Sequence, residues 1–307
     1  MTDYRAHFDF DLTFVNGGEL SGTGFRLDLP SAELDEAQIG RLLIAHLGLA
    51  LVDDVTLRGL RIVEEPHRGS RGVTDPAAAP GSGARARVVD LSHPIRAGLV
   101  TYPGLPSPQI TPHLTRADSR AKYAPGTEFA MDVITMIGNT GTYLDSPFHR
   151  YADGPDLAGL DLQTLVGLRT EVFHLTDAWT PERRGILPET LADRDVRGAA
   201  VLLHTGWDRH FGAPEYGHGA PFLTGAGAQW LIDAGAVLVG IDSLNIDDTE
   251  SGGERPAHSL LLEAGVHVVE HLTNLGDLPF SGALFTAAPP AVEGFGTFPV
   301  RAFAQLP

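Results

Sequence analysis

The first residues of the chain alternate apolar and polar side chains, as a half-buried strand does. The apolar positions are Phe8, Phe10, Leu12 and Phe14, with charged or polar residues between them. This period of two predicts a strand with one face in a core. Residues 16–18, Asn-Gly-Gly, tolerate the positive φ that a tight hairpin needs, and a second alternating stretch follows at residues 25–29.

A helix and a third strand are predicted next. Ser31 or Asp35 can cap a helix whose apolar positions recur at helical spacing. These positions are Ile39, Leu42, Leu43 and Leu47. Apolar residues from 55 to 62 suggest another strand. We therefore expect a small ββαβ domain over residues 1–67, and because no catalytic cluster is visible in it, we interpret it as an interaction or dimerisation module.

A change of composition separates this domain from the rest. Residues 68–87 are rich in Gly, Pro, Ala and Ser, which is typical of a flexible linker. Beyond them, short apolar runs at 200–203 and 237–241 predict buried strands, and residues 225–234 carry a helical pattern. We predict that residues 88–307 form one compact mixed α/β domain.

The composition limits the partners and the metal ligands that this protein can have. The chain has 307 residues and a formal net charge of -17, which argues against a nucleic-acid partner. It contains no cysteine, so a metal would need nitrogen or oxygen ligands. No apolar run is long enough to cross a membrane, and the first residues do not resemble a signal peptide. We expect a cytoplasmic protein that does not contact a membrane.

The stretch from Asn139 to His149 concentrates residues that can carry chemistry. Gly141 and Pro147 favour an irregular backbone, Asp145 is a candidate oxygen ligand, and His149 follows four residues later. From the residues alone, turn formation and function are about equally good explanations. Asp247 and Asp248 follow a predicted buried strand, and we interpret them as a solvated turn or as part of a site mouth.

Three ordered blocks resemble the cyclase family, which includes bacterial kynurenine formamidase and isatin hydrolase. The blocks are residues 90–95 with Tyr102-Pro103-Gly104, residues 139–149, and residues 240–243 with 257–261 and 269–275. Within 139–149, the positions that match the family signature are Gly141, Thr142, Asp145, Pro147 and His149. The resemblance spans residues 88–307 and implies a cyclase-like β/β/α domain.

The resemblance also implies roles for particular residues. Asp145, His258 and Glu270 would hold one divalent metal, manganese or zinc, and His149 would act as acid and base. Asn139 and Tyr143 stand where the family has two histidine ligands of another metal position. An amide oxygen and a neutral phenol are poor metal ligands, so the metal could also be absent.

The implied function is hydrolysis of a small cyclic amide, lactone or N-formyl compound by metal-activated water. Tyr143 is a second candidate for proton transfer, and Asn139, Tyr102 and Trp207 are candidate contacts for a small-molecule substrate. Two alternatives stay open: a metal-independent cyclase, dehydratase or isomerase that uses Tyr143 and His149, and a non-catalytic binding scaffold. We also expect a homodimer or homotetramer.

Overall fold

The computed structural model describes residues 3–47, 49, 51–65 and 87–306, and its contacts divide the chain into two compact units, Met1–Arg85 and Ala86–Pro307. The predicted linker, residues 68–87, lies outside the described residues apart from Arg87.

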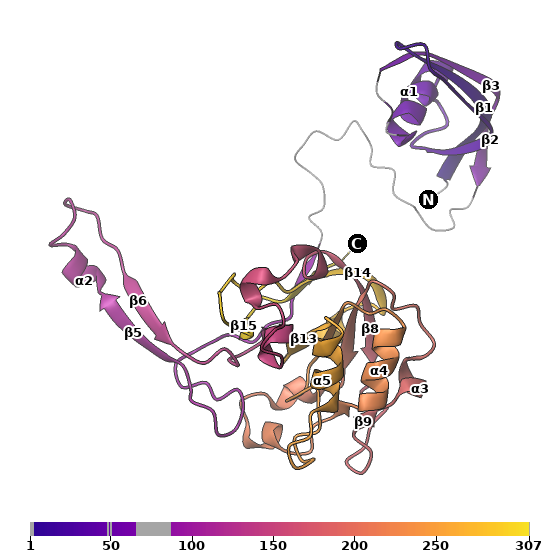
Figure 1. The fold of residues 1–307 in the computed structure, drawn as a ribbon. Helices are drawn as coiled ribbons and strands as arrows, with labels where there is room; N and C mark the ends of the chain where they lie inside the picture. Colours follow the sequence, from indigo (N-terminus) through magenta and orange to yellow (C-terminus); the bar gives the residue numbers. More distant parts are fainter. Residues whose placement is uncertain (1–2, 48, 50, 66–86, 307) are drawn as a thin grey trace. The chain divides into compact units, whose positions relative to one another are not determined.

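The smaller unit has the predicted ββαβ order (Figure 1). Its elements are β1 (Asp3–Phe14), β2 (Glu19–Leu29), α1 (Glu36–Leu47) and β3 (Val52–Glu65). The strands form an antiparallel sheet in the order β2-β1-β3. Alternate residues of β1 are buried against Ile39 and Leu43 of α1, as the period of two predicted. Asp35 Oδ1 accepts a hydrogen bond from the Gln38 backbone amide, and Gln38 Oε1 accepts one from the Asp35 backbone amide, so this pair caps the helix.

The larger unit is built on a nine-stranded sheet with the order β15-β7-β13-β12-β10-β8-β14-β16-β4. The four central strands β13, β12, β10 and β8 are parallel, and the pairs outside them are antiparallel. The sheet strands are β4 (Val88–Asp90), β7 (Tyr143–Asp145), β8 (Leu168–His174), β10 (Ala200–His204), β12 (Leu238–Ile241), β13 (His267–Glu270), β14 (Ser281–Thr286), β15 (Thr297–Pro299) and β16 (Phe303–Gln305). The predicted mixed α/β fold is confirmed.

Both faces of the central strands are covered. Val201 and Leu203 of β10 pack in one core cluster with residues of α4 (Gly225–Asp233) and α5 (Pro256–Glu263). Leu202, between them, belongs to a second cluster with residues of β7 and β14. Figure 1 shows α4 and α5 side by side over the sheet. Burial on both faces explains why these strands appear in the sequence as continuous apolar runs. Further short elements are α3 (Pro188–Leu191), β9 (Gly185–Ile186) and β11 (Phe222–Leu223).

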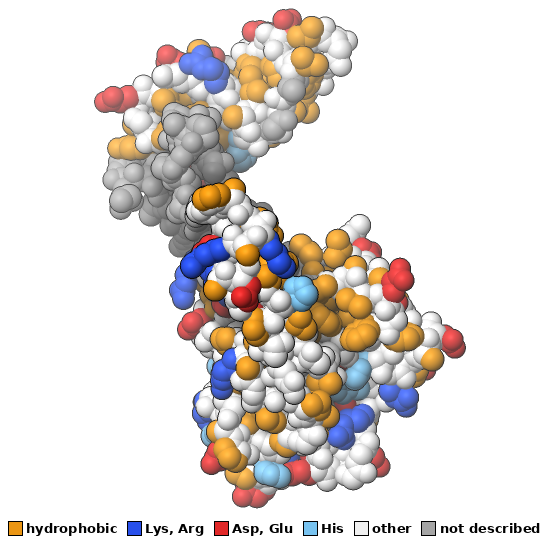
Figure 2. Space-filling view, turned by 90° about the vertical axis from the view of Figure 1, so that its left-hand side faces the viewer, with side chains coloured by type: hydrophobic (Ala, Val, Ile, Leu, Met, Phe, Trp, Pro, Cys, Tyr) orange, Lys and Arg blue, Asp and Glu red, His pale blue; other side chains and the backbone are white. Residues whose placement is uncertain are grey.

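A two-stranded ribbon projects from this unit (Figure 1). It consists of β5 (Gln109–Leu114) and β6 (Met131–Thr135), with α2 (Arg116–Ser119) between them. All residues of β6 are exposed, including Met131, Val133 and Ile134. Figure 2 shows further hydrophobic side chains gathered on one face of the larger unit. Among the described residues, no helix combines the length and apolar character needed to cross a bilayer.

Candidate active site

Strand β7 places Asp145 between two neighbouring strands. Gly141, with φ of 65°, turns the chain into β7, and its amide donates to Thr101. β7 then pairs antiparallel with β13 on one side and β15 on the other. In this register Asp145 lies opposite Val268 on one strand and Thr297 on the other, and the residue is 1% exposed.

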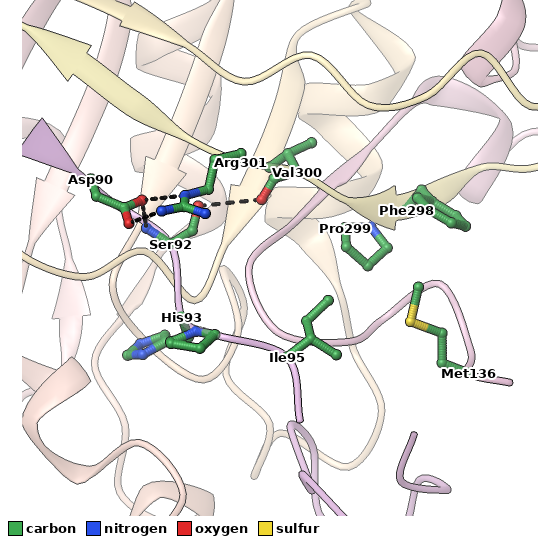
Figure 3. Close-up of a pocket in the computed structure, with 10 residues that line it drawn as sticks. Asp90, Ser92, His93, Ile95, Met136, Phe298, Pro299, Val300 and Arg301 are labelled. Carbon is green, nitrogen blue, oxygen red and sulfur yellow. Dashed lines mark hydrogen bonds and ion pairs between the residues drawn. The ribbon is translucent and has the colours of Figure 1, made fainter. Parts of the chain in front are cut away.

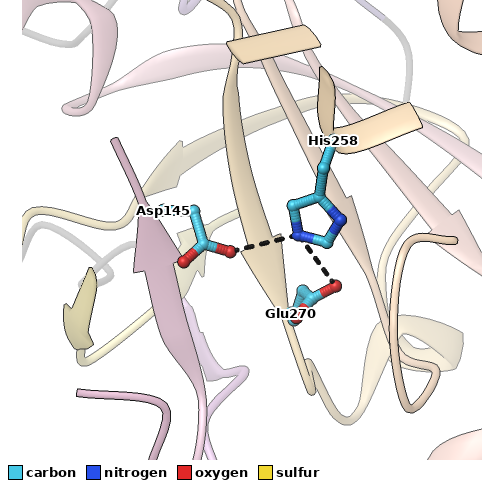
Figure 4. Close-up of side chains that lie close together, drawn as sticks. All are labelled: Asp145, His258 and Glu270. Atoms are coloured by element: carbon cyan, nitrogen blue, oxygen red, sulfur yellow. Dashed lines mark ion pairs between the residues drawn. The ribbon is translucent and has the colours of Figure 1, made fainter. Parts of the chain in front are cut away.

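Asp145, His258 and Glu270 meet in the larger unit (Figure 4). His258 Nε2 lies 3.5 Å from Asp145 Oδ2 and 3.5 Å from Glu270 Oε1, and the three ligand atoms are all within 4.8 Å of one another. Donors that share a tetrahedral zinc-like ion at about 2.1 Å lie about 3.4 Å apart. Asp145 Oδ2 is buried and has no hydrogen-bond partner among the residues that the structure describes. The spacing and this unsatisfied oxygen both fit a bound cation.

The charges of the cluster lead to the same conclusion. Burial lowers the pKa of His258, but neighbouring carboxylates outweigh burial and raise it to about 10. Those carboxylates belong to Glu270, Asp145 and Asp247. Burial also raises the pKa of Glu270 above its usual range. Buried acidic groups require a positive charge beside them. Protonated His258 supplies that charge here, and a divalent cation bound to the cluster would supply it instead.

Asp247 fixes the orientation of His258. Its Oδ2 accepts hydrogen bonds from His258 Nδ1 at 2.8 Å and from the His258 amide at 3.0 Å. Its Oδ1 accepts one from the Ala257 amide at 2.6 Å, at the start of α5. Since Nδ1 donates to Asp247, Nε2 of the neutral ring is a lone-pair donor directed at the other two carboxylates. Carboxylates orient metal-binding histidines in this way.

Glu270 is held from two sides. Its Oε1 accepts the Ile246 amide at 2.6 Å, and its Oε2 accepts the Tyr143 hydroxyl at 2.6 Å. Burial, together with Glu270 and Asp145, raises the pKa of Tyr143 well above its usual value. The phenol therefore stays protonated and serves as a donor to Glu270.

Thr297 connects Asp145 to His149. Its hydroxyl donates to Asp145 Oδ1, so its oxygen is left to accept a hydrogen bond from His149 Nδ1 at 2.7 Å. This pair of bonds keeps the proton of a neutral His149 on Nδ1. His149 Nε2 then carries a free lone pair, 3.9 Å from Asp145 Oδ1.

These groups line or adjoin a pocket of about 360 Å³. Its lining residues are Asn139, Tyr143, His149, Arg150, Asn245, Gly253, Arg255, His258, Ser259 and Glu270. The structure does not bring Tyr102 and Trp207 to this pocket. They lie in an aromatic cluster with Tyr216, where Trp207 is buried and donates to the Tyr216 carbonyl at 3.1 Å. Aromatic packing accounts for their position.

A second cavity, of about 410 Å³, lies beside β15 and β4 (Figure 3). Its charged residues, Asp90 and Arg301, form a two-point ion pair at 2.8 and 2.6 Å. They satisfy each other, and the cavity contains none of the groups of the Asp–His–Glu cluster.

Sequence reasoning missed two positioning residues. The sequence suggests a solvated turn or part of a site mouth at Asp247, but this residue is 2% exposed and accepts a hydrogen bond from the first turn of α5. Thr297 has no local signal, because it meets Asp145 only through the register of β15 on β7, 152 positions away. For Asp247, the signal in the sequence is a carboxylate that precedes the Pro-Ala-His start of a helix, where it can accept hydrogen bonds from the first amides.

The larger unit thus combines an α/β sheet with a buried Asp–His–Glu cluster that could hold a metal ion, beside a pocket lined by His149 and His258. A family model described as "Putative cyclase" matches residues 89–248. Kynurenine formamidase of Geobacillus thermodenitrificans is 31% identical over 216 residues, which is 70% of this chain and 95% of the relative. The chain belongs to the cyclase family.

Other relatives agree with this assignment. Isatin hydrolase of Roseibium aggregatum is 28% identical over 204 residues, covering 59% of this chain and 77% of the relative. A solved structure described as a potential metal-dependent hydrolase with cyclase activity has a TM-score of 0.58 and 28% identity, covering 71% and 96% of the two chains. An isatin hydrolase bound to the product analogue thioisatinate, at 24% identity and a TM-score of 0.60, covers 72% and 92% and shares the fold.

Proposed function

We propose that this protein hydrolyses a non-peptide C–N bond in a small cyclic amide or N-formyl compound, with one divalent cation held by Asp145, His258 and Glu270. The observation that carries the proposal is the buried Asp145 Oδ2, which has no hydrogen-bond partner within the described part of the chain and lies 3.5 Å from His258 Nε2. A cation there would supply a Lewis acid that polarises a carbonyl and lowers the pKa of water.

His149 is the proposed proton carrier. Its Nδ1 is committed to Thr297, so Nε2 can accept a proton from the attacking water and return it to the leaving nitrogen. The ring is about one-third exposed, at 37% of its side chain, and lines the pocket, so a substrate can reach it. Thr297 thus positions the base and one carboxylate oxygen together.

The residues of the site support the binding of one cation rather than two. Asn139 and Tyr143 stand where the family resemblance implies two histidine ligands. The Tyr143 oxygen is engaged with Glu270 at 2.6 Å and stays protonated, which makes it a poor ligand. The same raised pKa disfavours Tyr143 as the acid and base of a metal-independent reaction, and supports a role in holding Glu270.

Metal content and turnover test the proposal together. Purified wild type and Glu270→Ala are analysed for bound metal and assayed on formamides, lactones and cyclic imides, with and without manganese or zinc. We expect one metal per chain in wild type, activity that a chelator removes and the metal restores, and loss of both in Glu270→Ala. A metal-free wild type that hydrolyses an amide, and still does so as Glu270→Ala, would overturn the proposal.

A further inference from the structure

Two arginines line the same pocket as His258 and Glu270. Arg150 directly follows His149, and Arg255 precedes α5, the helix that carries His258. Both are therefore attached to elements that already position the reactive groups. Neither takes part in the hydrogen bonds that hold the Asp–His–Glu cluster.

Neutral protein groups hold the two guanidinium groups. Arg150 Nε donates weakly to Ser259 Oγ at 3.4 Å, and its guanidinium lies 5.2 Å from the Tyr151 ring centre. Arg255 Nη1 donates to the carbonyls of Glu254 at 2.7 Å and Asp248 at 3.2 Å. Across residues 87–306, neither guanidinium forms an ion pair with a carboxylate, and each keeps unused N–H donors.

The local charge balance favours an anionic ligand. A divalent cation would offset most of the charge of the buried carboxylates, and the two arginines would then leave the pocket rim positive. This contrasts with the chain as a whole, whose formal net charge is -17. Arginine presents a planar fork of donors that matches a carboxylate with two hydrogen bonds. Asn139 and Asn245 add neutral amides to the same wall.

We propose that Arg150 and Arg255 bind a carboxylate on the substrate, so that the preferred substrate is an amide or N-formyl compound that also carries a carboxylate. This inference rests on the proposed hydrolysis for the identity of the reacting group. Recognition of the anion itself depends only on the two arginines, and it can therefore be measured without turnover.

The experiment compares paired probes that differ only in charge. The substrates are 2-formamidobenzoate and formanilide, and the non-reacting ligands are benzoate and benzamide. The variants are Arg150→Gln, Arg255→Gln and, as a matched control, Arg116→Gln on the distant ribbon. Losing a charge-assisted hydrogen bond predicts a roughly 10- to 100-fold weaker interaction with the charged probe.

We expect each pocket variant to raise KM for 2-formamidobenzoate by that factor and to change KM for formanilide less than about twofold. Calorimetric titration of benzoate and benzamide, into both chelator-treated and manganese-loaded protein, should show the same selective loss, and the control should match wild type. If neither formamide is hydrolysed, the proposed function fails for these compounds and the titrations still decide the anion site. Equal losses for charged and uncharged probes, or no loss with benzoate, would overturn the inference.

Discussion

Replacing Asp247 by asparagine tests how the site is positioned. The carboxylate accepts three hydrogen bonds, from the Ala257 amide, the His258 amide and His258 Nδ1. An amide of the same shape has one accepting oxygen, so at least one buried donor must face an NH₂ group. Leaving one such donor unsatisfied costs about 1–3 kcal/mol. For a domain of this size, the melting temperature should fall by about 2–12 °C.

The effect on metal binding follows from the same geometry. If the NH₂ group faces the imidazole, Nδ1 can no longer donate, and the ring proton moves to Nε2, which is directed at Asp145 and Glu270. Loss of an outer partner of this kind typically lowers metal affinity about 10- to 100-fold, or about 1.4–2.8 kcal/mol. Titration of manganese or zinc against a chromophoric chelator measures this change, alongside thermal unfolding.

A neighbouring residue provides the control. Asp248 Oδ1 accepts from the Glu250 amide at 3.0 Å and from Arg184 at 3.2 Å, and does not touch His258. Asp248→Asn should therefore loosen the same loop without changing metal affinity. Asp247→Asn with wild-type metal affinity but lower stability would refute the reasoning about the tautomer, and would leave Asp247 as a helix cap only.

Further predictions concern His149, the two substituted positions, acid stability and assembly. Thr297→Val should lower kcat about 10-fold or more, since His149 loses its partner; steady-state kinetics measure this, and an unchanged kcat would contradict the assigned tautomer. Asn139→His combined with Tyr143→His should raise the bound metal above that of wild type in elemental analysis, and an unchanged content would contradict the weak-ligand argument. Burial lowers the pKa of His267 to about 4; because the folded value lies below the usual 6.5, stability is full above pH 6.5 and is lost as pH falls towards 4. At about 1.36 kcal/mol per pH unit over roughly 1.5 units, His267 alone should contribute about 2 kcal/mol less stability at pH 5 than at pH 7.5, so the stability difference between wild type and His267→Gln in denaturant unfolding should change by about that amount between the two pH values. Light scattering should give the mass of a dimer or tetramer, and a monomer at every concentration would contradict that expectation.

The parts of the fold that bury one or two clear faces could be predicted from the sequence. Phe8, Phe10 and Leu12 alternate because one face of β1 packs on α1, and all three are buried. The run of residues 200–203 is apolar because β10 is covered on both sides. The ribbon of β5 and β6 was not predicted. Its residues are almost all exposed, so no periodic burial marks them in the sequence.

The site also contains residues that the sequence identifies and residues that only the structure identifies. Asp145, His258 and Glu270 were identified through the family resemblance, and the structure brings them together. Their outer partners depend on tertiary geometry that the sequence does not display. Asp247 reaches His258 through a loop that folds back on α5, and Thr297 reaches Asp145 through pairing of strands at the sheet edge.

The pairing of β7 with β13 also has a consequence for folding kinetics. It joins Tyr143 to Glu270, which are 127 positions apart, so the metal ligands on these strands come together only when a long loop of chain has closed. Contacts of this kind are slow to form and tend to be completed after the main barrier to folding. A cation that binds only the completed cluster should therefore leave the refolding rate nearly unchanged and slow unfolding. The lifetime of the folded enzyme would then depend on the free metal concentration around it.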